Sequence, residues 1–216
     1  ASYQLYESRT WIPQIGVTWS VAVTSLGLVM ILLALVLVPI VLVAGWNENE
    51  DRGAQPALVL SLQAFMVLIF AAFDLAVFYI AFEAMLVPLY LMIGRYGLGE
   101  ASARHKAAMK FLLYSLFGGL VMLGGIIYIW ARLAATQADT TAFFRMDTLA
   151  GILPTQSMPA QMVIFVTFMV AFAIKAPMVP VHTWLPDAAA VARPGTSVLL
   201  VGVLDKIGTF GMITMC

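Results

Sequence analysis

The chain has 216 residues, of which 62% are hydrophobic and only 10% are charged, and its mean hydropathy is +0.98. Because soluble domains carry about 25% charged residues, this composition excludes an ordinary soluble protein and is typical of a chain that crosses a membrane several times. The formal net charge of zero gives a nucleic-acid partner no electrostatic support, and the single cysteine, Cys216, excludes an internal disulfide and any multi-cysteine metal or iron–sulfur site.

Residues 1–20 are mixed in polarity and aromatic, so we expect an extracytoplasmic or interfacial segment with Trp11 and Trp19 at the membrane surface. Residues 21–216 then form a transmembrane helical domain, because apolar runs recur along them and about 20 such residues cross roughly 30 Å of hydrocarbon. Continuous runs exclude transmembrane strands, which need alternating polar residues. The predicted fold is all-α and polytopic, with helices at about 21–45, 57–73, 75–94, 108–131, 160–181 and 196–216.

The connections between these helices carry most of the charges. They are expected at 47–53, at Asp74 as a tight turn or polar kink, at 95–107 and at 132–159. Lys and Arg are more numerous in the loops after the first, third and fifth helices, which predicts that these loops face the cytoplasm. The sequence begins without a methionine and ends inside an apolar run, so we expect it to be a fragment of a longer protein, truncated at both ends.

Three ionisable residues lie inside the apolar segments: Glu83, Lys175 and Lys206. A charge near the centre of a bilayer costs roughly 2.5–3.5 kcal/mol on insertion scales, and residues of this kind usually serve the movement of ions or protons. For Glu83 the functional interpretation is a proton-accepting or charge-pairing site, and the alternative is a polar residue satisfied by a neighbouring helix. Because pairing offsets part of the cost of each charge, we expect Glu83 and Lys175 to lie close together.

Lys175 precedes Pro177 and Pro180, which cannot donate to the hydrogen-bond ladder of a helix, so we expect a break near Lys175–Pro180. Broken helices at membrane depth occur where they are buried in protein or line a cavity, and transporters commonly use them at ion sites. Burial drives a lysine towards its neutral form and a nearby acid drives it towards its charged form, so such a pair can act as a switch. His182 follows the break and is either a proton relay or a hydrogen-bonded core residue.

Three other charged residues leave alternatives open. Asp187 caps a helix or faces the interface, and Lys110 either extends to the cytoplasmic surface or faces inward. Asp205 directly precedes Lys206, so its side chain points about 100° away and makes a poor direct partner. The sequence contains no GxGxxG, P-loop, CxxC or nucleophile-elbow motif, so binding of NADH, flavin or haem by this chain is not supported, and no metal site is predicted.

Three segments carry a resemblance to a known family: FEAMLVPLYLMIG at 82–94, AFAIKAPMVPVHTWLPDA at 171–188 and GVLDKIGTFG at 202–211. They resemble the membrane subunit M of proton-translocating NADH–quinone oxidoreductase (complex I). This antiporter-like family also holds subunits L and N and subunits of Mrp cation/proton antiporters, and the EAMLVPLY run looks like subunit M rather than L or N. The resemblance implies a fourteen-helix subunit, of which this chain would hold the third to the eighth helix.

The resemblance also implies roles for individual residues. Glu83 matches the glutamate of the fifth helix and Lys175 matches the lysine of the broken seventh helix, which together form an acid–lysine pair. Lys206 matches the lysine of the eighth helix, which passes protons along the membrane axis, and His182 matches the histidine after the break. Asp205 departs from the family, which often has an apolar residue at this position.

The implied function is that of a proton-translocating subunit of an NADH:quinone oxidoreductase. This chain would hold no cofactor, since NADH, FMN, iron–sulfur clusters and quinone are expected in other subunits. The expected partners are other membrane subunits of complex I, including L- and N-type neighbours, and the lipid bilayer, in a bacterial plasma membrane. Two alternatives remain: a subunit of an Mrp-type cation/proton antiporter, and a scaffold whose charges only hold helices together. The VPLY run disfavours the antiporter, and three separately buried charges disfavour the scaffold.

Overall fold

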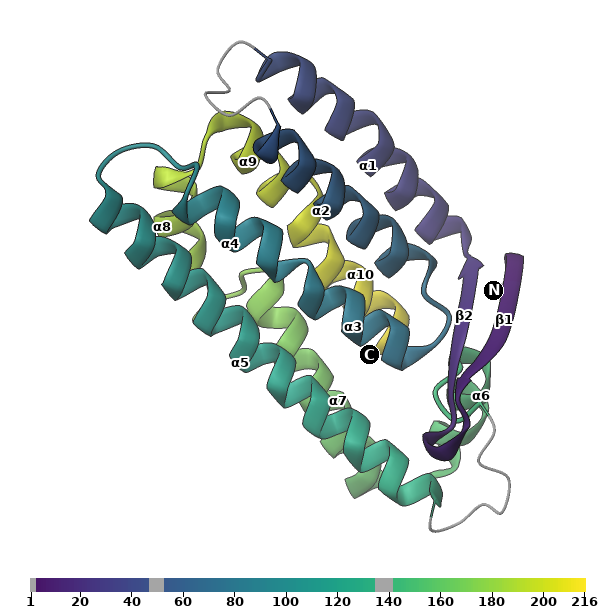
Figure 1. The fold of residues 1–216 in the computed structure, drawn as a ribbon. Coiled ribbons are helices and arrows are strands. Elements are labelled where there is room, and N and C mark those ends of the chain that lie inside the picture. The colour runs from purple at the N-terminus through teal and green to yellow at the C-terminus, as the bar shows by residue number, and fades with distance from the viewer. Residues whose placement is uncertain (1–2, 47–52, 135–141) are drawn as a thin grey trace.

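The computed structural model of the chain describes residues 3–46, 53–134 and 142–216, which are mostly helical (Figure 1). Within these residues, six helical segments are long and apolar enough to cross a membrane, which confirms the predicted all-α, polytopic fold. The six segments are Ser25–Ala44, Ala54–Ala71, Leu75–Gly94, Ala101–Ala134, Met158–Lys175 and Pro194–Met215.

An antiparallel hairpin precedes the bundle: β1 (Gln4–Ile12) pairs with β2 (Val17–Val23), and the 3-10 segment Pro13–Ile15 lies between them. Gly16 ends this turn in a left-handed conformation with a φ of 73°, which glycine adopts without steric cost. The helix predicted at about 21–45 is present, but it begins only at Ser25, because residues up to Val23 belong to β2. The apolar end of β2 merges in hydropathy with the helix that follows, whereas its β-branched residues favour a strand.

The first two spans are α1 (Ser25–Ala44) and α2 (Ala54–Ala71), which pack side by side (Figure 1). Thr24 caps α1, since its hydroxyl accepts a hydrogen bond from the backbone N–H of Gly27 at 3.0 Å. The chain therefore enters its first membrane span directly from the hairpin, through a single capping residue.

The third span consists of two helices, α3 (Leu75–Ala84) and α4 (Leu86–Gly94), which are divided at Met85. Pro88 contributes to this division because it has no N–H to donate to the preceding turn. The next helix, α5 (Ala101–Ala134), is the longest that the structure describes. The predicted loop at 95–107 is thus too long, because the Ala, Arg and Lys of its second half are strong helix formers and continue α5 beyond the apolar span.

The remaining elements precede or follow the predicted break along the chain. The short helix α6 (Met146–Ile152) and the 3-10 segment Leu153–Thr155 lie in the connection expected at 132–159. The helix α7 (Met158–Lys175) ends at the break, and α8 (Trp184–Val191) follows it. The last span is continuous but irregular, and it consists of α9 (Pro194–Leu199), a π-helical segment (Leu200–Leu204) and α10 (Asp205–Met215).

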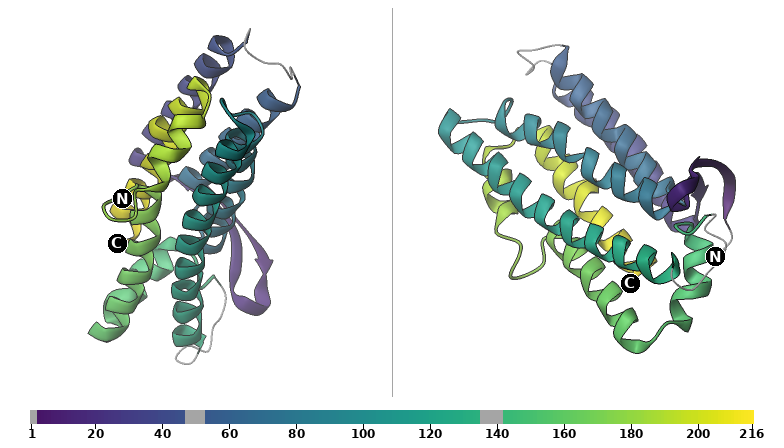
Figure 2. Two further views of the ribbon diagram at one scale, coloured as in Figure 1. Left: turned by 90° about the vertical axis from the view of Figure 1, so that its left-hand side faces the viewer. Right: turned by 60° about the horizontal axis from the view of Figure 1, so that its bottom comes forward.

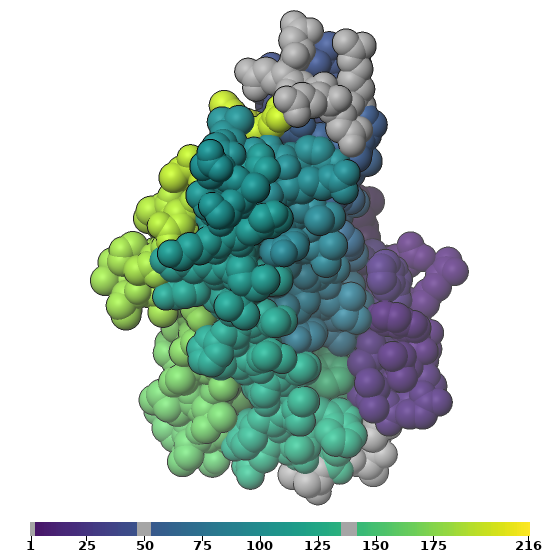
Figure 3. All heavy atoms as spheres, turned by 60° about the vertical axis from the view of Figure 1, so that its left-hand side comes forward, coloured from purple at the N-terminus to yellow at the C-terminus, as the bar shows by residue number. Residues whose placement is uncertain are grey.

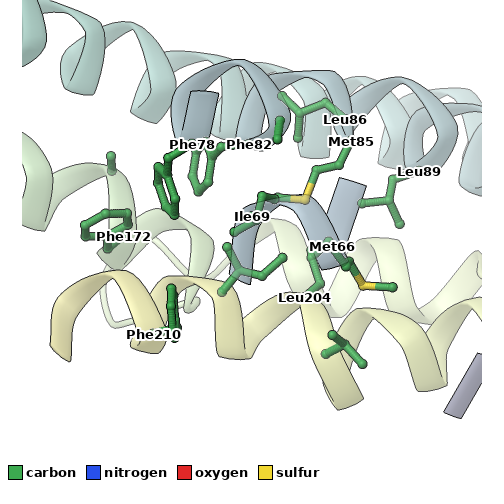
Figure 4. Packing of buried hydrophobic residues seen from close by; sticks show 14 of the residues in the cluster. Met66, Ile69, Phe78, Phe82, Met85, Leu86, Leu89, Phe172, Leu204 and Phe210 are labelled. Atoms are coloured by element: carbon green, nitrogen blue, oxygen red, sulfur yellow. The ribbon is translucent and has the colours of Figure 1, made fainter. Parts of the chain in front are cut away.

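The helices form layers with an aromatic core between them. Helices α7 to α10, in green and yellow, lie in one layer, and α4 and α5, in teal, lie in another (Figure 2). The long helix α5 packs along α7 and α4, and Figure 3 shows its outer side with the hairpin beside it. In the core, Phe172 of α7 lies between Phe78 and Phe82 of α3 and Phe210 of α10 (Figure 4). Its ring centroid is 6.1 Å from that of Phe78 and 6.3 Å from that of Phe82.

Two of the connections with the larger Lys and Arg content, those after the third and the fifth predicted helix, lie together at one end of the bundle. The backbone N–H of Leu98 donates to the carbonyl of Val191 at 2.6 Å, and Nε of Arg193 donates to the carbonyl of Tyr96 at 2.7 Å. The hairpin and α6 lie at the other end (Figure 1). The structure therefore groups these two connections as the sequence predicts, while most of the connection expected at 47–53 lies outside the described residues and the assignment of this end to the cytoplasm stays a prediction.

Asp74 joins the hairpin to the start of α3. It is fully buried, and its carboxylate accepts hydrogen bonds from the N–H and the hydroxyl of Thr18, at 3.0 and 2.8 Å, and from the N–H of Ala76 at 2.9 Å. The backbone N–H of Phe73 also donates to the carbonyl of Ser20 at 2.9 Å. The turn predicted at Asp74 is therefore a helix cap that also anchors a strand.

Asp74→Ala is expected to destabilise the full-length protein by about 2 kcal/mol, because it removes a helix cap and takes away the side chain that accepts from the buried N–H of Thr18. Thermal unfolding in detergent measures this loss, and limited proteolysis reports on the hairpin. The matched control is Asp147→Ala, which removes an exposed carboxylate paired with Arg145 and should cost at most about 1 kcal/mol. Equal stability of the two variants would show that the Asp74 cluster does not anchor the hairpin.

Candidate functional site

The break after α7 is held by specific hydrogen bonds. Residues 176–183 form turns between α7 and α8. The indole N–H of Trp184 donates to the carbonyl of Ile174 at 2.9 Å, and the N–H of Met178 donates to the carbonyl of Ala173 at 2.9 Å. A carbonyl freed at membrane depth needs a new partner, so the fully buried Trp184 stabilises the interruption. The predicted break is confirmed, and Lys175 is the last helical residue before it.

Lys175 points into the protein. Only 1% of its surface is exposed, and its ammonium group lies 4.7 Å from the ring centroid of Phe82 and 5.9 Å from that of Phe111. Aromatic faces attract a cation but do not replace the hydrogen bonds that it makes in water. Within the part of the chain that the structure describes, the ammonium has no hydrogen-bond partner. Lys175 is therefore a buried amine whose donors are left unused.

Glu83 of α3 reaches towards a pair of glycines on α5. A Cβ on Gly119 would overlap Oε1 of Glu83, so the missing side chain leaves room for the carboxylate. On the neighbouring Gly118, a Cβ would lie 3.2 Å from Cδ1 of Ile174. Because the two glycines have no side chains, they leave room for the carboxylate of Glu83 and for the close approach of α7, the helix that carries Lys175. Oε1 of Glu83 is buried and has no hydrogen-bond partner among the described residues.

The structure brings Glu83 and Lys175 together from α3 and α7. Their side chains interact electrostatically, and Phe82, the neighbour of Glu83, lies against the ammonium group. The described residues show no hydrogen bond or ion pair between the two side chains. A proton that passes between them therefore needs a bridging group such as water.

Sequence reasoning missed a polar group on α5. Ser115 is 2% exposed, and its buried Oγ has no hydrogen-bond partner within the described ranges. It lies four residues before Gly119, so the two positions share one face of the helix. A single serine in an apolar helix does not by itself indicate a functional site. The feature of the sequence that could have identified Ser115 is its spacing of four residues from Gly119, which places both on one face of the helix.

Lys206 and Asp205 lie at the start of α10. The ammonium group of Lys206 donates a hydrogen bond to the carbonyl of Val201, in the π-helical segment, at 2.6 Å. As the sequence predicts, Asp205 is not its direct partner, because the described residues show no ion pair between them. Asp205 nevertheless interacts electrostatically with both Lys206 and Lys175.

The structure resolves some of the open alternatives near the break. Lys110 and Asp187 form an ion pair of 2.7 Å at the partly exposed surface, so Lys110 links α5 to α8 instead of facing inward. His182 is half-buried in the turns after Lys175, and its Nδ1 has no hydrogen-bond partner in the described chain. Neither a hydrogen bond nor an ion pair joins His182 to Lys175 among the described residues, so its relay role stays a prediction.

Comparison with known proteins places this constellation in a family. The family described as NADH:quinone oxidoreductase/Mrp antiporter, TM, matches residues 72–216, which include Glu83, Lys175 and Lys206. The chain belongs to this family. NADH-quinone oxidoreductase subunit M of Mycobacterium tuberculosis is 39% identical over 247 residues, an alignment that covers 99% of this chain and 44% of that protein. NADH-ubiquinone oxidoreductase chain 4 of Arabidopsis thaliana is 33% identical, with coverages of 99% and 41%.

Solved structures share the fold of this chain. A chain of respiratory complex I from Thermus thermophilus with bound NADH has a TM-score of 0.78 and 31% identity, covering 98% of this chain and 42% of its own length. A chain of the Mrp complex from Dietzia sp. DQ12-45-1b has a TM-score of 0.84 at 22% identity, which shows a common fold. The resemblance to subunit M read from the motifs is confirmed. The chain spans less than half the length of the curated relatives it matches.

Proposed function

We propose that the chain belongs to a proton-translocating membrane subunit of an NADH:quinone oxidoreductase, and that Glu83 and Lys175 carry protons through it. The observation that carries this proposal is the fully buried Lys175 at the end of a broken helix, which interacts electrostatically with Glu83 without a direct ion pair among the described residues. Charges that only hold helices together would pair directly, because an unpaired buried charge is costly. The similarity to subunit M supports complex I over an Mrp-type antiporter.

The chemistry follows from how the two groups influence each other. When Glu83 is ionised, it stabilises the protonated form of Lys175, and when Glu83 is neutral or withdraws, burial favours release of the lysine proton. A change in the charge of Glu83 therefore loads or unloads Lys175. Lys206, on the next span, is the group that would receive the proton, and His182 would serve as a relay at the break.

The wider setting of the protein belongs to the same proposal. The partners would be other membrane subunits of complex I, including L- and N-type neighbours, within a bacterial plasma membrane. Electron transfer from NADH to quinone would take place on cofactors held by other subunits, and this chain would contribute the proton path without a cofactor of its own.

Glu83→Gln in the full-length protein within its complex tests the proposal, because it keeps the size of the side chain and removes its charge. Proton pumping and coupled quinone reduction are expected to fall by about tenfold, since Lys175 loses the charge that stabilises its protonated form. A pH-sensitive dye in membrane vesicles measures pumping during NADH oxidation, and NADH oxidation by ferricyanide measures the amount of assembled enzyme.

Glu7→Gln is the matched control for this experiment, because Glu7 is an exposed hairpin carboxylate paired with Arg9. It should pump at the parental rate. If Glu83→Gln also pumped at the parental rate in assembled complex, the buried charges would have a scaffold role and the proposal would fail.

A further inference from the structure

Asp205 is a carboxylate within a candidate membrane span that neither the predicted acid–lysine pair nor the fold explains. It is half-buried, and its Oδ1 is inaccessible and has no hydrogen-bond partner in the described ranges of the chain. An isolated carboxylate is among the most expensive groups to place at membrane depth, so an unpaired one calls for a reason.

A helix cap does not supply that reason. Asp205 is the first residue of α10, and a carboxylate at a free helix N-terminus is stabilised by unpaired N–H groups. The segment before it is a π-helix (Leu200–Leu204) in one continuous span, so α10 has no free N-terminus to cap. Single π turns within α-helices are frequent at functional positions, where they redirect the following side chains.

Contacts three residues further on place Asp205 beside the end of α7. A Cβ on Gly208 would lie 2.6 Å from the backbone nitrogen of Ala176 and 2.8 Å from the carbonyl oxygen of Phe172. The backbones of α10 and α7 therefore meet at the residues that flank Lys175. Since positions three apart are neighbours on a helix surface, Asp205 lies on the side of α10 that faces the break.

Two positively charged side chains act on Asp205. Its carboxylate interacts electrostatically with Lys206 and with Lys175. The ammonium group of Lys206 is already bonded to the carbonyl of Val201, and Lys175 has no partner among the described residues. The carboxylate thus interacts electrostatically with two amines, and among the described residues it forms an ion pair with neither of them.

We propose that Asp205 is an acidic relay that links Lys175 to Lys206. The ammonium group of Lys175 transfers its proton to the carboxylate of Asp205, through bridging water, which leaves a neutral amine and a neutral carboxylic acid. The acid then gives this proton, again through bridging water, to the amine of Lys206 in its neutral form and becomes a carboxylate again. Lys175 then has two acids, Glu83 on α3 and Asp205 on α10, one of which loads it while the other unloads it. This inference rests on the proposed proton translocation and adds a step to it.

Two substitutions in the full-length protein within its complex test this relay. Asp205→Asn keeps the shape and hydrogen-bonding capacity of the side chain but cannot take up a proton, so pumping per assembled enzyme should fall about tenfold. Asp205→Glu keeps the carboxyl group and should restore most of the activity. The matched control, Asp147→Asn, changes a carboxylate that is paired with Arg145 outside the spans and should pump at the parental rate.

The order of the two variants separates a relay from a packing role. A purely structural polar group would tolerate the isosteric Asn better than the longer Glu, so higher activity with Asn would overturn the inference. Each pumping rate is divided by the rate of NADH oxidation with ferricyanide, so that a loss of assembled complex is not mistaken for a loss of proton transfer. Parental pumping by Asp205→Asn alongside reduced pumping by Glu83→Gln would reject the relay and leave the proposed function standing. Parental pumping by both variants would reject the proposed function as well.

Discussion

Lys175→Met should stop proton pumping and coupled quinone reduction while leaving the complex assembled. Methionine has nearly the length and the unbranched shape of lysine, and it fills the space between Phe82 and Phe111 with apolar surface. Replacing a buried charge by a well-packed apolar group is often neutral or stabilising for the fold. The lost amine, however, takes away the group that accepts and releases the proton, so pumping should fall by about a hundredfold or more.

This expectation separates transport from scaffolding because the two roles predict opposite results. If Lys175 only holds helices together, Lys175→Met should reduce assembly and spare the activity of the molecules that do assemble. The measurements are pumping by vesicles and the amount of complex on a native gel. The matched control is Lys106→Met, because Lys106 is exposed on α5 and should affect neither quantity. Pumping above half of the parental rate in fully assembled Lys175→Met would contradict the proton-carrying role.

The buried charges could be predicted from the sequence because their cost is a property of each residue in its own apolar segment. The cost of placing Glu83 or Lys175 at membrane depth does not depend on which helices lie next to it. The break after Lys175 could also be predicted from the sequence, since Pro177 and Pro180 interrupt the hydrogen bonds of their own helix. In the structure the two side chains interact electrostatically without a hydrogen bond or ion pair between them among the described residues, so a direct pair is not seen.

The parts of the site that escaped prediction depend on contacts between helices that are far apart in the sequence. Gly119 matters because Glu83 occupies the space of its missing side chain, and Trp184 matters because its indole reaches the carbonyl of Ile174. Neither contact produces a periodic pattern or a motif that can be recognised in a single sequence. The hairpin was missed for another reason, since only two polar residues, Thr24 and Ser25, separate the apolar end of β2 from the apolar run of α1.

Gly119→Val should reduce proton pumping about as much as the loss of the Glu83 charge, by about tenfold, although the substituted residue has no charge. A Cβ at this position overlaps Oε1 of Glu83, and the nearest atoms all belong to that carboxyl group. Because the end of a flexible side chain can move aside, the fold should persist while the acid is displaced from its place near Lys175. Gly124→Val is the matched control on the same helix, since a Cβ there has no neighbour within 4 Å.

A double-substitution cycle shows whether the glycine acts through the acid. If Gly119→Val works by displacing Glu83, adding it to Glu83→Gln should reduce pumping no further than Glu83→Gln alone, because the charge that it displaces is already absent. Additive losses would mean instead that valine disturbs the packing of α5 on α7 independently of the acid. Pumping by Gly119→Val that equals pumping by Gly124→Val would show that the position of the Glu83 carboxylate against α5 does not control the state of Lys175.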